Sequence, residues 1–146
     1  RSPEQAQDVL IARYDGQLVD LQEAAAATKF VPNAPEQLPH GYARAGIYVL
    51  KMPCCVCTQT IYKNQDGEVL AVFEHQDDER EWFGDRPRIM ADCCGKDTCF
   101  VELPSQLAAT WKCGSRYLTI VGIRDVDQVA EFVAFLNAQN QESAPS

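Results

Sequence analysis

The chain has 146 residues, of which 46% are hydrophobic and 23% are charged, and its formal net charge is −8 at pH 7. A domain of this size buries a core without disulfide or metal support. The negative charge excludes nucleic acid and anionic membrane surfaces as expected partners, because both bind Lys and Arg, and it favours cations.

Residues 1–18 are expected to form a helical lead. Ser2 before Pro3 is typical of a helix start, and Gly16 is typical of a helix stop. The apolar stretch 9–14 is also compatible with a strand, and this alternative stays open.

A second helix is predicted over residues 21–29. Asp20 and Glu23 form the pattern of a capping box directly before an alanine-rich run. Three prolines then predict an extended segment, since each removes a hydrogen-bond donor and disfavours helix in the residue before it; they are Pro32, Pro35 and Pro39.

The middle and the end of the chain have the pattern of an antiparallel sheet. Asp66–Gly67 is a hairpin signal, and the charged stretch 76–88 is typical of a long surface loop. The predicted strands are 45–52, 58–63, 69–75, 98–103, 107–111 and 116–122.

A C-terminal amphipathic helix is predicted to begin after Asp125 and to pack its apolar stripe on the sheet. Residues 139–146 are expected to be a polar tail. The predicted fold is therefore α+β, an antiparallel β-sheet with N-terminal helices and a C-terminal helix packed on it. We expect one domain over residues 1–138, with a core over 19–138.

Seven cysteines are the main functional signal. An odd number cannot be paired completely in disulfides, and adjacent cysteines rarely bridge each other. Soft thiolates at short spacing are ligands for thiophilic metals. Metal binding is therefore the first hypothesis, ahead of partial disulfides and of inert thiols.

Two of the cysteine groups have chelating spacing. Cys54 and Cys57 form C-x-x-C, and Cys94 and Cys99 form C-x4-C. If both lie at one edge of the sheet, four thiolates complete a tetrahedral zinc site, with Cys55 and Cys93 as spare ligands. Six thiolates would also suit copper(I). Cys113 is interpreted as an isolated, replaceable thiol near a hairpin tip, whereas Cys57 and Cys99 are expected to be the least replaceable.

The order of several short motifs adds a resemblance. The motifs are 19–25, 30–32, 38–42, two strands around Asp66–Gly67, then Trp111, Gly114 and Tyr117 before 121–122, and a final Asp-led helix. Over residues 19–138 this order resembles the extracytoplasmic domains of membrane-anchored bacterial anti-sigma factors. The resemblance implies a membrane helix upstream, an extracytoplasmic location and a protein partner in a sigma-factor regulatory system. The cysteine clusters depart from the general pattern and suggest a metal or redox input.

The expected function is therefore a non-enzymatic regulatory or sensor domain that binds a thiophilic metal, with zinc as the first candidate. A thiol-dependent enzyme or oxidoreductase is the runner-up, since His75 could act as a base near a thiol. His40 lies in a proline-rich loop and is interpreted as a solvated turn residue. An interaction domain with structural disulfides is the third hypothesis.

Overall fold

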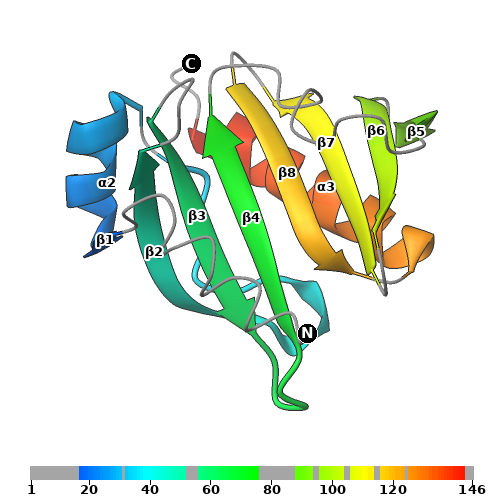
Figure 1. Ribbon diagram of the computed structural model, residues 1–146, viewed down its shortest axis with the longest axis horizontal. Helices are drawn as coiled ribbons and strands as arrows, with labels where there is room; N and C mark the ends of the chain where they lie inside the picture. The colour runs from blue at the N-terminus through cyan, green and yellow to red at the C-terminus, as the bar shows by residue number, and fades with distance from the viewer. Residues whose placement is uncertain are drawn as a thin grey trace.

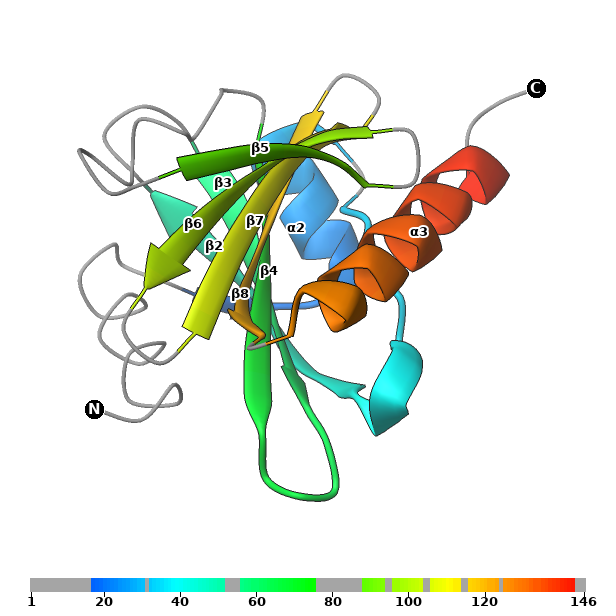
Figure 2. The same ribbon diagram turned by 90° about the vertical axis from the view of Figure 1, so that its right-hand side faces the viewer.

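The computed structural model describes residues 17–30, 32–51, 56–75, 88–93, 96–103, 106–113, 116–123 and 125–143. Within these residues eight strands form one antiparallel sheet, and two α-helices lie on the same face of it (Figures 1 and 2). The strands are β1 Gln17–Val19, β2 Ala43–Lys51, β3 Val56–Lys63, β4 Val69–His75, β5 Arg88–Cys93, β6 Lys96–Leu103, β7 Gln106–Cys113 and β8 Arg116–Ile123.

The strand order is β1-β2-β3-β4-β8-β7-β6-β5. Strands that follow each other along the chain are paired, except that β4 pairs with β8 instead of β5. The sheet therefore consists of two meanders, β1–β4 and β5–β8, that meet between β4 and β8. Gly122 of β8, with φ +112°, lies so close to β4 that a Cβ there would stand 2.7 Å from the carbonyl oxygen of Val69.

Helix α2, Leu21–Thr28, begins with the expected capping box. The Asp20 carboxylate accepts a hydrogen bond from the Glu23 N–H at 2.8 Å, and the Glu23 carboxylate accepts one from the Asp20 N–H. The helix buries Ala24 against Ile47 and Val49 of β2. The prediction of a helix at this position is confirmed.

Helix α3, Val126–Ser143, covers the other half of the same sheet face (Figure 2). The Asp125 carboxylate accepts a hydrogen bond from the Asp127 N–H and so caps the helix. The buried helix residues and the strand residues beneath them form the largest core cluster, which includes Val129, Phe132, Val133, Leu136, Trp111, Leu118 and Ile120. Helix α3 extends to Ser143 and so includes residues 139–143 of the expected polar tail.

The α+β fold expected from the sequence is confirmed. Strands β1 and β5 were not predicted, because β1 has only three residues and the run in β5 lacks a clear polar–apolar alternation. Residues 1–16 of the expected helical lead and residues 76–87 of the expected loop lie outside the described residues. The remaining parts of both predictions were wrong, because residues 17 and 18 belong to strand β1 and Arg88 begins strand β5.

Candidate functional site

Three of the described cysteines lie near strand termini at the same end of the sheet. Neighbouring strands are antiparallel, so the end of one strand and the start of the next lie at the same end of the sheet. The end at the top in Figure 1 carries the end of β2, the start of β3, the ends of β5 and β7 and the start of β8. Cys57 is the second residue of β3, Cys93 is the last residue of β5, and Cys113 is the last residue of β7. Cys54, Cys55 and Cys94 lie outside the described residues.

Cys57 is part of the hydrophobic core. It is fully buried, and it pairs in register with Leu50 of β2. It belongs to a second apolar cluster on the sheet face opposite the helices, which also includes Leu50, Ile61, Val69, Ala71 and Phe73. This environment is typical of a cysteine that serves as a small apolar side chain.

The structure does not bring Cys57 and Cys99 together. Cys99 lies inside β6, opposite Met90 of β5 and Thr110 of β7, and strands β4, β8 and β7 separate it from β3. Four strand spacings of about 4.8 Å place the two Cα atoms about 19 Å apart along the sheet. Two cysteines that share one zinc ion have Cα atoms within about 10 Å, because each side chain and its Zn–S bond reach about 5 Å. One ion therefore cannot bind both residues in this arrangement.

The position of Cys99 differs from the expected one because residues 88–93 form strand β5, which pairs with β6. The sequence predicted a strand only from residue 98, but β5 ends at Cys93 and β6 begins at Lys96. Cys99 is therefore the fourth residue of an extended strand. Its distance from the turn is set by the strand rise of about 3.3 Å per residue.

Cys93 and Cys113 have the more compatible positions. They end the two strands that flank β6, and Cys93 pairs in register with Lys96 of β6. The register of Thr98 with Trp111, continued by two residues, brings Lys96 level with Cys113. Two strand spacings separate their Cα atoms by about 10 Å, which exceeds the roughly 7 Å limit of a disulfide and is at the upper limit for two ligands of one metal ion.

A buried ion pair lies beneath this end of the sheet. The Glu74 carboxylate of β4 accepts hydrogen bonds from Nε of Arg116 on β8 and from the Asn33 N–H, the latter at 2.6 Å. The Arg116 guanidinium also lies over the Phe30 ring, 4.8 Å from its centroid. Burial raises the pKa of Glu74, and the two hydrogen bonds and the Arg116 charge oppose this shift. The Glu74–Arg116 pair joins the two meanders. The sequence signal for this pair was Glu74 itself, a single carboxylate on the apolar face of a strand.

The two histidines occupy different positions. His40 lies in the 3-10 turn η1, Pro39–Gly41, where its Nε2 is 2.8 Å from Oε2 of Glu131 and its ring contacts Phe132 of α3. It therefore anchors the turn to α3 and is not a purely solvated residue. His75 is the last residue of β4.

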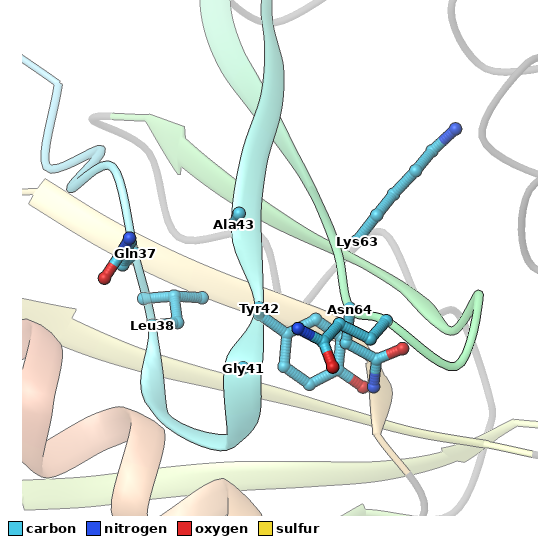
Figure 3. Close-up of a pocket in the computed structure, with 8 residues that line it drawn as sticks. Gln37, Leu38, Gly41, Tyr42, Ala43, Lys63 and Asn64 are labelled. Atoms are coloured by element: carbon cyan, nitrogen blue, oxygen red, sulfur yellow. The ribbon is translucent and has the colours of Figure 1, made fainter.

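A groove of about 460 Å³ lies at the opposite end of the sheet, beside the β3–β4 hairpin (Figure 3). The Lys63 side chain extends away from Tyr42 in this view. The lining residues are Gln37, Leu38, Gly41, Tyr42, Ala43, Lys63, Asn64 and Gln65. The groove is far from the strand ends that carry cysteines.

Within the described residues, no three Cys, His, Asp or Glu side chains are grouped so that they could hold a metal ion. The helices of the described part of the chain include none that is long and apolar enough to cross a membrane. Comparison with protein-family models, with curated proteins and with solved structures found no match to this chain.

Proposed function

We propose that this domain binds a thiophilic metal ion, with zinc as the first candidate, at the sheet end where β5 and β7 terminate. Cys93 and Cys113 are the ligands taken from the described residues. Cys94, Cys54 and Cys55 are the candidates for the remaining positions. The observation that carries the proposal is the placement of Cys93 and Cys113 on the two strands that flank β6.

The chemistry of this sheet end supports metal binding over a disulfide. The separation of the two Cα atoms is too large for a disulfide bond, as derived above. Copper(I) is the alternative ion, because it also prefers thiolate ligands.

The biological role follows from the resemblance to anti-sigma factors. We propose a non-enzymatic regulatory domain that lies outside the cytoplasm, that is tethered through an upstream membrane helix, and that acts with a protein partner of a sigma-factor system. Metal would then protect thiolates from oxidation in that compartment and would contribute its binding free energy to folding.

The test is the metal content of the protein prepared under reducing conditions, measured by elemental analysis, for the wild type and two variants. We expect Cys113→Ser to lose most of the bound metal, which replaces the expectation from the sequence that Cys113 is replaceable. Cys57→Ser is the matched control; we expect it to keep the metal and to lose stability by about 1–3 kcal/mol, because a hydroxyl replaces a thiol in an apolar cluster.

A chelator should lower the melting temperature of the wild type and should have a smaller effect on Cys113→Ser. Wild-type protein that contains no metal after preparation with zinc or copper(I) would contradict the proposal. Loss of metal in Cys57→Ser with full retention in Cys113→Ser would return the site to the β2–β3 connection.

A further inference from the structure

The outer edge of β5 is a long, regular strand edge. In the described part of the chain no strand lies beyond β5, and its register with β6 runs through six residue pairs without a bulge. The opposite edge of the sheet is formed by β1, which has only three residues. Short edge strands and bulges are common protections against pairing with another chain, and β5 has neither.

The register of β5 with β6 brings two acidic residues opposite each other. Asp92 of β5 pairs in register with Asp97 of β6. Like charges that are directly opposite each other in an antiparallel pair are destabilising. A cation on the outer side of Asp92 would therefore be favourable.

The strand itself carries that cation. Arg88 lies four residues before Asp92, at the other end of β5. If a second copy of β5 pairs antiparallel with the first and the two Met90 residues are opposite each other, Arg88 of each copy stands opposite Asp92 of the other. The same pairing brings Ile89 opposite Ala91 of the second copy, so apolar residues fill the centre.

We propose that two copies of this chain associate through their β5 edges and form one continuous antiparallel sheet across a twofold axis. The interface is isologous, so the Arg88–Asp92 contact forms twice by symmetry. The main-chain hydrogen bonds of the added strand pair supply affinity, and the two charged pairs set the register. A single strand pair buries less surface than a standard interface, so the dissociation constant is expected in the micromolar range. This inference does not depend on metal binding.

The test is sedimentation of the full chain over a wide concentration range, with a reductant present so that no disulfide can link the copies. The wild type should shift from the mass of one chain to that of two chains. Arg88→Asp and Asp92→Arg should each abolish the dimer, because each brings like charges together at both ends of the interface. The combined variant Arg88→Asp/Asp92→Arg should restore it.

Lys63→Asp changes the net charge as Arg88→Asp does, but it lies on β3. It should leave the dimer unchanged, and circular dichroism should show that all four variants are folded. Several outcomes would overturn the proposal. They are a wild type that stays monomeric at the highest concentration, a dimer that survives both single changes, and a combined variant that remains monomeric although it is folded.

Discussion

Replacing Arg116 with Met should destabilise the fold in a pH-dependent manner. The change removes the guanidinium and keeps an apolar stem that can contact Phe30. Glu74 is only 3% exposed, so its carboxylate would be left buried without its ion-pair partner. Removing one partner of a buried pair costs about 3–5 kcal/mol at neutral pH, because the remaining charge is uncompensated.

The sign of the pH dependence follows from Glu74. Burial raises its pKa in the folded protein above the ordinary value of 4.5, and loss of Arg116 removes an opposing charge. A folded state with a raised pKa keeps a proton that the unfolded chain has released. Its contribution to stability is therefore fully present below the ordinary value and is lost as the pH rises through the raised pKa.

The assay is urea denaturation followed by tryptophan fluorescence at about pH 5 and about pH 8, with the cost of the substitution compared at the two values. We expect a larger cost at the higher pH. Arg44→Met is the matched control. Its guanidinium donates to the carbonyl oxygen of Ala34, which does not titrate, so its cost of about 1 kcal/mol should not change with pH. An Arg116→Met cost that is equal at both pH values would refute the reasoning.

Three further predictions concern the stability of the fold, and two of them include a control substitution. Gly122→Ala should lower the free energy of unfolding by several kcal/mol, because its Cβ would collide with a β4 carbonyl. Gly67→Ala is the control. It should cost only about 1 kcal/mol, because Gly67 also has a positive φ but has open space around it. Tyr62→Phe should cost about 1 kcal/mol, since the Tyr62 hydroxyl donates a hydrogen bond to the carbonyl oxygen of Pro35. Burial also raises the pKa of Tyr62, so an absorbance titration of the wild type should show one tyrosine that ionises only after unfolding. Asp20→Ala should cost about 1 kcal/mol through loss of the α2 cap, and Asp20→Ser should recover most of it. Chemical denaturation measures the change in the free energy of unfolding for each variant. A Gly122→Ala cost as small as that of Gly67→Ala would contradict the close approach of β4 and β8.

Features that depend on neighbouring residues were predictable from the sequence. The capping residues Asp20 and Asp125, the turn at Gly67 and the apolar stripe of α3 each act within a few positions of the chain. Their hydrogen bonds and periodicity are local, so a single sequence is enough to recognise them.

Features that depend on contacts between distant segments were not predictable. Nothing near Glu74 indicates that its partner is Arg116, 42 residues later, because that contact requires β4 to pair with β8. The role of Cys57 was hidden for the same reason, since a thiol in a core and a thiol in a metal site have the same local sequence. The placement of Cys99 required β5, a strand whose composition gives little local signal.

The junction of β4 with β8 has a consequence for how the protein opens. Every other strand pair in the described sheet joins segments that follow each other along the chain, so each meander can assemble from local hairpins. The β4–β8 seam has to close a long loop of chain before its hydrogen bonds form, and it is the late, cooperative step expected in folding. Amides on both sides of this seam should therefore exchange with solvent together, as one unit, when the two meanders part.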